Sequence, residues 1–549
     1  MSTTALSISL GGLLAALPWA KQRLALSRAK HRSLSGHSRM AKRVVSMIPG
    51  YAYTEAEFFN ADAAPQDIVA RRHAGLSRLQ GVFEQRFAKS LAMTDQTKPY
   101  ISDLQFISSY KVPYQFSHYL SQKIRAGSFL QSSQGVKVQD LDGNQFYDLT
   151  GSYGVNVLGY DFYKETMAQA LQTAGALGPV LGAYHPCVLD NVQRLTQISG
   201  LDEVSFHMSG TEAVMQAVRM ARYHTGKKYL VRFCGAYHGW WEDVQPGPGN
   251  PMPPRETYTL KDMDRRSLEV LRHRKDIACV LVNPLQALHP NASAPGDNSL
   301  IDSSRRAGFD RAAYTAWLKD LRQVCTEAGI ALIFDEVFLG FRLDVGGAQA
   351  YFGVQADMVT YGKTLGGGFP IGVVCGTSAL MKRFKPSRPA DVCFARGTFK
   401  EHPYVMASMN AFLHALERPE IKALYEDQDA RWNLRCDQFN AQMAQANLPI
   451  RAQNMSSVWT ITYTEPSRYN WMLQFYLREQ GLALSWVGSG RLIFSLNYTD
   501  EDFAEVTRRF VQAGEQMKAD GWWWEGAHLS NKDIKRIVLK EMLKRRLLK

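Results

Sequence analysis

Short apolar runs punctuate the middle of the chain, and each is typical of a strand buried in a sheet. The segments between them carry apolar residues at helical spacing, as at Val214, Ala217, Val218 and Ala221. Strands that alternate with helices in this way favour βαβ units and a parallel sheet. The pattern predicts an α/β domain whose strands span residues 229–233, 279–283, 331–335, 358–361 and 372–375.

One lysine stands directly after a predicted strand. Lys363 follows the run at 358–361 and precedes three consecutive glycines, Gly366 to Gly368. A lysine at the end of a buried strand is costly unless its amine is used, and a Schiff base to an aldehyde cofactor is one such use. Glycines let a cofactor approach the backbone closely. The alternative is a surface lysine at a tight turn.

A carboxylate ends another predicted strand. Asp335 closes the continuous apolar run at 331–335, which is typical of a strand buried on both faces. Ligands of open α/β sheets bind at the carboxyl ends of strands. An anion there suits a protonated pyridinium nitrogen, which makes a pyridoxal ring an electron sink. The alternative is a helix N-cap aspartate.

Two loops carry further candidate groups. Ser209, Gly210 and Thr211 open a predicted helix, and the free N–H groups of its first turn form an anion site that suits a cofactor phosphate. Tyr237 and His238 follow the strand at 229–233, where an aromatic side chain can stack on a cofactor ring. The alternatives are helix capping without a ligand and ordinary loop packing.

In this order and spacing, these motifs resemble those of class III pyridoxal-phosphate aminotransferases of fold type I, and in particular glutamate-1-semialdehyde 2,1-aminomutases. Residues 209–222, 334–342 and 346–354 carry the likeness together with the lysine loop, and it extends over roughly residues 100–515. The resemblance implies an α/β fold with a large domain around a mainly parallel, seven-stranded sheet. A smaller α+β domain and helical extensions at both ends complete the expected architecture.

The resemblance also implies roles for the residues of the cofactor site. Lys363 would carry pyridoxal 5'-phosphate (PLP) as a Schiff base and serve as the general base. Asp335 would pair with the ring nitrogen. Ser209, Gly210 and Thr211 would hold the phosphate.

Further residues follow from the same resemblance. Tyr237 would stack on the ring with His238 beside it. Thr398 would reach the phosphate of the neighbouring subunit's cofactor, which implies a homodimer with active sites at its interface. Ser152 and Tyr153 match the place where the family lines its substrate pocket.

Two segments depart from the aminomutase pattern. Shortly after Thr398 the aminomutases usually have Gly-Asn-Pro, whereas this chain has Lys-Glu-His-Pro at 400–403. A similar run occurs in aminotransferase domains of polyketide and peptide synthases, which act on carbonyls of carrier-bound acyl chains. Asn283 stands where the family often has the glutamate of a Val-Glu-Pro motif. Neither departure removes a residue that transamination needs.

We therefore expect a PLP-dependent aminotransferase that moves an amino group from an amine donor to a carbonyl acceptor by a ping-pong mechanism. The expected acceptor is an amphiphilic aldehyde or a carrier-bound keto acyl chain. One alternative is an isomerase of the glutamate-1-semialdehyde 2,1-aminomutase type. Another is a non-catalytic, membrane-associated scaffold that retains a relict cofactor site.

The chain is long enough for two or more domains, at 549 residues. We expect a small domain built from two separate segments around a central cofactor-binding domain. The expected parts are a basic, helical N-terminal extension at 1–99, the first part of the small domain at 100–164, the PLP-binding large domain at 165–415, the second part of the small domain at 416–525, and a basic amphipathic helix at 526–549.

The N-terminal region is basic and partly apolar. No acidic residue precedes Glu55, whereas eight lysines and arginines lie between Lys21 and Arg43. Residues 8–20 are apolar but too few to span a bilayer. An apolar stretch followed by a basic one suits attachment to a membrane surface. A mitochondrial transit peptide has a similar composition.

The C-terminal region repeats this theme. Trp522, Trp523 and Trp524 precede the basic helix, and tryptophans favour the headgroup region of a membrane. The alternative is a helix that packs on the dimer with its lysines solvated. The net charge of +13 suits an anionic membrane, an acidic acyl carrier protein or simply phosphate-bearing ligands. No nucleic-acid recognition motif is visible, so a nucleic-acid partner is not expected.

The cysteine pattern points to a reducing compartment. The seven cysteines form no Cys-x-x-Cys pair, and several lie in predicted core strands. We therefore expect free thiols, a cytoplasmic enzyme that associates peripherally with the inner face of a membrane, and no metal site.

Overall fold

The computed structural model describes residues 17–30, 38–105, 112–127, 129–245, 247, 249–252, 254–288, 290–291, 307–484, 491–526 and 529–547. The chain forms two compact units. Unit 1 comprises Met1–Arg43, Gln169–Ala294 and Asp310–Ala415. Unit 2 comprises Val44–Ala168, Pro295–Phe309 and Leu416–Lys549. The five-part division expected from the sequence stays a prediction.

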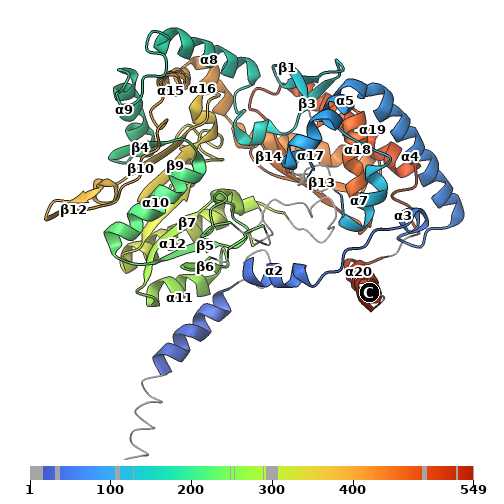
Figure 1. The fold of residues 1–549 in the computed structure, drawn as a ribbon, viewed down its shortest axis with the longest axis horizontal. Helices are drawn as coiled ribbons and strands as arrows, with labels where there is room; N and C mark the ends of the chain where they lie inside the picture. Colours follow the sequence, from blue (N-terminus) through green and yellow to red (C-terminus); the bar gives the residue numbers. More distant parts are fainter. Residues whose placement is uncertain are drawn as a thin grey trace, which may run out of the picture. The chain divides into compact units, whose positions relative to one another are not determined.

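Unit 1 is built on a seven-stranded sheet (Figure 1). The strand order is β4-β10-β9-β8-β7-β5-β6, and only β10 runs antiparallel to its neighbours. The α/β fold class and the mainly parallel seven-stranded sheet are therefore confirmed. The strands are β4 (Glu203–His207), β5 (Tyr229–Phe233), β6 (Thr257–Leu260), β7 (Ile277–Val282), β8 (Ala331–Asp335), β9 (Met358–Gly362) and β10 (Gly372–Gly376).

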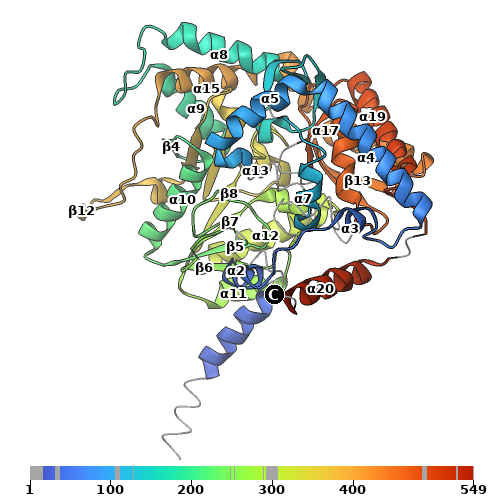
Figure 2. The same cartoon turned by 45° about the vertical axis from the view of Figure 1, so that its right-hand side comes forward.

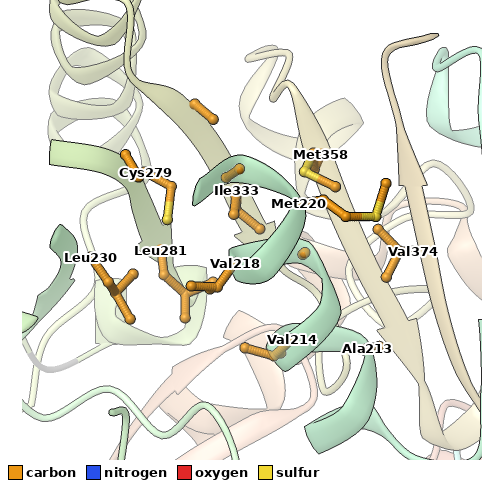
Figure 3. Close-up of a cluster of buried hydrophobic side chains, with 14 of the residues drawn as sticks. Ala213, Val214, Val218, Met220, Leu230, Cys279, Leu281, Ile333, Met358 and Val374 are labelled. Carbon is orange, nitrogen blue, oxygen red and sulfur yellow. The ribbon is translucent and has the colours of Figure 1, made fainter. Parts of the chain in front are cut away.

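Helix α10 (Gly210–Thr225) covers one face of this sheet (Figure 3). Its apolar residues recur at helical spacing, and small alanines among them let the helix pack closely on the strands. Side chains alternate between the faces of each strand. Helix α12 (Arg311–Ala328) therefore meets the opposite set, and its Trp317 ring lies 6.0 Å from that of Phe233. The α10 core includes Ala213, Val214, Val218, Met220, Leu230, Cys279, Leu281, Ile333, Met358 and Val374.

Short elements complete unit 1. They are α9 (Cys187–Ser199), α11 (Arg265–His273), η4 (Pro284–Leu288), α13 (Gly347–Phe352), η5 (Lys363–Gly366), α14 (Ser378–Met381), the hairpin β11 (Phe384–Lys385) and β12 (Arg388–Val392), and α15 (Pro403–Ala415). Helix α8 (Tyr160–Ala174) and helix α2 (Ser38–Ser46) each span a boundary between the units.

Unit 2 is an α+β arrangement with two small sheets. One has the order β1-β2-β3-β15 and the other β13-β14-β16. Its strands are β1 (Leu130–Gln134), β2 (Lys137–Asp140), β3 (Gln145–Asp148), β13 (Ile450–Met455), β14 (Val458–Tyr463), β15 (Leu482–Ala483) and β16 (Arg491–Ile493). Its helices are α3 (Glu55–Phe59), α4 (Gln66–Arg86), α5 (Ala88–Thr97), η2 (Lys98–Tyr100), α7 (Tyr114–Ser121), η3 (Gly151–Gly154), α16 (Pro419–Tyr425), α17 (Gln428–Gln445), η6 (Asn470–Met472), α18 (Leu473–Glu479), α19 (Asp500–Ala519) and α20 (Asn531–Leu547).

The three consecutive tryptophans lie inside unit 2. Trp522 and Trp523 are 0% and 7% exposed, and the indole N–H of Trp522 donates to the Tyr476 hydroxyl over 2.8 Å. The half-buried Trp524 donates to Asp62 over 2.9 Å. The expectation that these residues lie at a membrane interface is therefore wrong for Trp522 and Trp523, because their buried rings cannot reach lipid headgroups.

The terminal segments are helical where they are described. A helix covers residues 17–29, and its Trp19 is exposed with the Arg23 guanidinium 4.7 Å from the ring centroid. Residues 8–16 of the apolar run lie outside the described residues. No helix in the described ranges combines the length and hydropathy that a membrane crossing needs.

Candidate active site

The site lies where β8 and β9 end, side by side. The two strands are parallel, and Asp335 pairs in register with Thr360. Asp335 is the last residue of β8, and Lys363 is the first residue after β9. Parallel strands therefore carry both predicted residues to one edge of the sheet.

Lys363 has an unusual backbone conformation. Its φ is 50°, in the left-handed region that non-glycine residues seldom adopt. Such a conformation costs about 1–3 kcal/mol and clusters at active sites. The Lys363 Nζ lies 5.0 Å from the centroid of the Phe338 ring. The turn into η5 thus directs a strained, half-buried lysine next to an aromatic ring.

Asp335 belongs to a buried network of hydrogen bonds. Its Oδ2 lies 2.8 Å from His238 Nδ1, and both residues are at most 3% exposed. Its Oδ1 accepts from the Val337 N–H (3.2 Å) and from the Thr360 hydroxyl (3.3 Å). Because a carboxylate only accepts, His238 carries its proton on Nδ1. Among the described residues, His238 Nε2 is buried without a hydrogen-bond partner.

The N-terminus of α10 approaches the lysine loop closely. A Cβ on Gly210 would lie 2.5 Å from Val337 Cγ1, and a Cβ on Gly362 would lie 3.2 Å from the same atom and 3.7 Å from Gly210 Cα. The helix N-terminus, the residues after Asp335 and the residue before Lys363 therefore meet at Val337. Only glycine fits at position 210 without a shift of its neighbours.

The first turn of α10 is capped reciprocally. Ser209 is the N-cap, and its Oγ accepts from the Glu212 N–H over 3.2 Å. Glu212 Oε2 accepts from the Met208 N–H over 2.9 Å. Thr211 lies against the loop that holds the aromatic pair, because its Oγ1 would be 2.7 Å from a Cβ on Gly239. The cap uses the side chain of Ser209, while the positive end of the helix faces the site.

Tyr237 sits on the loop after β5. It is 49% exposed, and its carbonyl accepts from the Asn283 side chain over 3.1 Å. Partial burial and the Asp335 carboxylate raise the pKa of Tyr237. Asn283 therefore supports the aromatic loop from the position where the family often carries a glutamate.

The remaining predicted residues lie elsewhere. Thr398 is exposed in unit 1, near the exposed Phe399. Ser152 and Tyr153 belong to unit 2, where both have left-handed backbones with φ of 44° and 58°. The Ser152 hydroxyl lies 2.8 Å from that of Tyr160. Their roles at a cofactor or substrate stay predictions.

Two groups of the site were not anticipated. The Thr360 hydroxyl donates a hydrogen bond to Asp335. Its position two residues before the end of β9 is the sequence feature that could have identified it. Glu336 is 1% exposed and accepts from the backbone N–H groups of Ala348 (2.6 Å) and Gln349 (3.1 Å). Burial raises the pKa of Glu336 to about 8, against the lowering effect of those hydrogen bonds. No pattern in the sequence distinguishes this glutamate from a solvated one.

The segment at 400–403, which differs from the aminomutase pattern, contains an ion pair that is largely buried from solvent. The Lys400 ammonium contacts the Glu401 carboxylate, and their side chains are 12% and 9% exposed. The charge of Lys400 also reaches β4, where burial and then the nearby Arg383 and Lys400 lower the pKa of His207 to about 3. His207 therefore stays neutral two residues before the N-cap of α10. Among the described residues there is no group of three or more His, Cys, Asp or Glu positioned to hold a metal ion.

Comparison with known proteins places the chain in a family. The model of the family described as "Aminotransferase class-III" matches residues 120–243 and 300–513. The chain is 34% identical over 311 residues to the glutamate-1-semialdehyde 2,1-aminomutase of Alkaliphilus oremlandii (strain OhILAs), covering 53% of this chain and 68% of that protein. It is 30% identical over 409 residues to the enzyme of that name from Nitratidesulfovibrio vulgaris (strain DP4), covering 69% and 90%.

Solved structures agree. A structure described as a transaminase with PLP bound superposes with a TM-score of 0.64 at 26% identity, over 79% of this chain and 99% of that one. A glutamate-1-semialdehyde aminomutase from Pseudomonas aeruginosa PAO1 shares the fold, with a TM-score of 0.63 at 18% identity over 82% and 99% of the two chains. The family model covers more than half of the sequence, so the chain belongs to the class III aminotransferases.

Proposed function

We propose that this protein is an aminotransferase that moves an amino group from an amine donor to a carbonyl acceptor by a ping-pong mechanism. As a class III aminotransferase it is a PLP-dependent enzyme. The observation that carries the proposal is the convergence of Lys363, Asp335 and the α10 N-terminus at the ends of β8 and β9. We assign the PLP-binding part to residues 165–415.

The residues of this edge fit the cofactor. Asp335 offers a buried carboxylate to a cationic ring nitrogen. The positive end of α10, with Gly210 and Thr211 in its first turn, suits the phosphate. Lys363 supplies the amine. When bound, PLP supplies an electron sink for the carbon next to the substrate nitrogen.

Lys363 moves the proton in the proposed mechanism. Its Nζ would take the proton from the substrate carbon next to nitrogen and hold it for return, as a general acid–base. Asp335 accepts hydrogen bonds from the Val337 N–H, the Thr360 hydroxyl and the His238 Nδ1–H, which fix the orientation of its carboxyl group. Tyr237 and His238 lie on the loop after β5, and the partly exposed Tyr237 is the residue we propose to stack on the cofactor ring.

The acceptor we propose is an amphiphilic aldehyde or a carrier-bound keto acyl chain. Two departures from the aminomutase pattern support it: Asn283 replaces a carboxylate next to the Tyr237 loop, and the segment at 400–403 carries the Lys400–Glu401 ion pair. Ser152 and Tyr153 are the proposed substrate-facing residues. The second candidate is an isomerase acting on glutamate 1-semialdehyde, which the relatives of that name at 30–34% identity favour.

We also propose a homodimer in which Thr398 reaches the partner's cofactor phosphate. Exposed aromatic side chains surround this segment of unit 1: Phe394 and Phe399 are 69% and 48% exposed, and Phe384 on β11 is 52% exposed. Apolar surface of this kind is typical of an interface. The seven free cysteines, six of them buried, support the proposal of a cytoplasmic enzyme.

A half-reaction screen tests the proposed function. The PLP-loaded protein is mixed with amines of increasing chain length, and the absorbance of the lysine-bound cofactor is followed. Loss of that absorbance with long-chain amines, followed by its recovery with a matching carbonyl compound, is the expected result. Conversion of glutamate 1-semialdehyde to 5-aminolevulinate would establish the second candidate instead. If the protein responds neither to the amines nor to glutamate 1-semialdehyde, both candidate functions are contradicted. Lys319→Ala is the control variant and should behave like the native protein.

A further inference from the structure

Helix α20 lies at the periphery of unit 2 (Figure 2), and side chains on one of its faces bind the rest of the unit. Glu541 Oε2 accepts from the Tyr53 hydroxyl (2.5 Å) and the Tyr51 hydroxyl (3.1 Å), and Arg468 Nη1 donates to Glu541 Oε1 over 2.8 Å. One turn further, Arg545 pairs with Glu57 of α3 over 2.9 Å. Burial opposes ionisation of Glu541, yet the bonds from Arg468 and Tyr53 hold its pKa below the usual value. These contacts fix which way the helix faces.

The opposite face carries a row of leucines. Leu539 and Leu543 are each 52% exposed, and Leu547 is 87% exposed. They recur every four residues, so they form one stripe about 12 Å long at a rise of about 1.5 Å per residue. The other apolar residues of the helix, Ile534, Ile537 and Val538, are half-buried, whereas Leu543 is exposed.

Basic side chains flank this leucine stripe on both sides. On a helix with 3.6 residues per turn, Lys535 and Arg546 lie on one side of the stripe, and Lys540 and Lys544 lie on the other. Of the two acids of α20, Glu541 lies on the attached face, whereas the partly exposed Asp533 pairs with Arg536 over 3.9 Å. Asp533 accepts from the Ser530 N–H over 3.1 Å at the helix start, and Glu541 points into unit 2. The exposed basic residues are Lys532, Lys535, Arg536, Lys540, Lys544 and Arg546.

We propose that this outward face of α20 binds the surface of an anionic lipid bilayer. A leucine stripe between basic flanks is the pattern of a helix that lies in the membrane interface, with lysine stems along the apolar zone and ammonium groups at the phosphates. The six exposed basic residues outnumber the one acid on this side, Asp533, which pairs with Arg536 over 3.9 Å, so the face keeps a net positive charge that complements anionic lipid. Because Glu541 and Arg545 already hold the helix in place, binding orders little additional chain.

Vesicle flotation of the full-length protein tests the proposal. We expect binding to vesicles of phosphatidylcholine with phosphatidylserine, little binding to phosphatidylcholine alone, and release at high salt, which screens the charges. Lys540→Gln with Lys544→Gln is expected to lower partitioning about 25-fold, at about fivefold for each basic residue near the surface. Leu539→Ser with Leu543→Ser is expected to lower it about tenfold.

Matched variants elsewhere on the surface control for charge and hydropathy. Lys319→Gln with Lys422→Gln removes the same charge from α12 and α16, and Leu434→Ser changes a leucine that is 58% exposed on α17. All should float like the native protein, and all variants should retain the helical circular dichroism and the bound-cofactor absorbance of the native protein.

Three outcomes would overturn the proposal. They are binding that does not depend on anionic lipid, equal losses in the control variants, and binding of an acidic carrier protein in place of vesicles. The readout is independent of turnover, so failure of the proposed reaction leaves this test intact.

Discussion

Replacing Gly210 by alanine tests the packing that joins α10 to the lysine loop. A Cβ at this position would lie 2.5 Å from Val337 Cγ1 and 3.0 Å from Val337 Cγ2. Carbon atoms in ordinary contact are about 3.5–4.0 Å apart, so Val337 or the first turn of α10 must move by about 1 Å. Overpacking of this size costs about 1–3 kcal/mol. At about 2–4 °C per kcal/mol for a unit of this size, the cofactor-free variant should unfold several degrees below the native protein.

The same shift should weaken cofactor binding. A charge at a helix N-terminus gains about 0.3–1 kcal/mol, so partial loss of alignment raises the Kd for PLP by up to about fivefold. Thermal unfolding of the cofactor-free protein and titration with PLP measure the two effects. Gly81→Ala is the matched control: Gly81 lies inside α4 with open space at its Cβ position, and the change should stabilise by about 0.5–1 kcal/mol.

Val337→Ala tests whether crowding against Val337 causes the loss of stability expected for Gly210→Ala. Val337→Ala removes both atoms that the new Cβ would meet, so the double variant should be more stable than the sum of the single effects implies, by about 1–2 kcal/mol. If Gly210→Ala unfolds at the native temperature, or if the double variant is no more stable than the sum of the two single effects implies, the packing argument fails.

Three further predictions address other parts of the molecule. Lys363→Ala should abolish turnover, and borohydride reduction followed by peptide mass spectrometry should find the cofactor on Lys363 in the native protein only; cofactor on another lysine would refute the assignment. Glu336 has a folded pKa raised from 4.5 to about 8, so the stability that it contributes is fully present below pH 4.5 and is lost as the pH rises through about 8. Glu336→Gln should flatten this decline in unfolding curves measured across that range, and an unchanged slope would contradict it. Glu541→Gln should weaken the contacts to Arg468 by about 1.5–3 kcal/mol and expose α20 to trypsin at concentrations that spare the native protein.

The sequence predicted the site better than its surroundings. Lys363 and Asp335 follow from short contiguous patterns, because a strand end fixes where the next side chain points. The tryptophans at 522–524 were misplaced because their partners, such as Tyr476, lie tens of residues away in the chain. Gly210 was attributed to a phosphate alone, whereas the crowding by Val337 depends on a contact between distant segments. Contacts of that kind leave no local pattern.

The residues of the candidate site share one feature: each of them costs the fold free energy. Lys363 holds a left-handed backbone, the Asp335–His238 pair and Glu336 are buried, and Gly210 lies where no side chain fits. Strained or buried polar groups persist only where the surroundings fix them. The core beneath α10 supplies that rigidity, since the apolar residues of the helix and of five strands pack into one cluster. A cofactor that binds the folded chain stabilises it further by mass action. If PLP binds at this edge of the sheet, as we propose, its binding free energy offsets part of the cost of the strained and buried groups in unit 1.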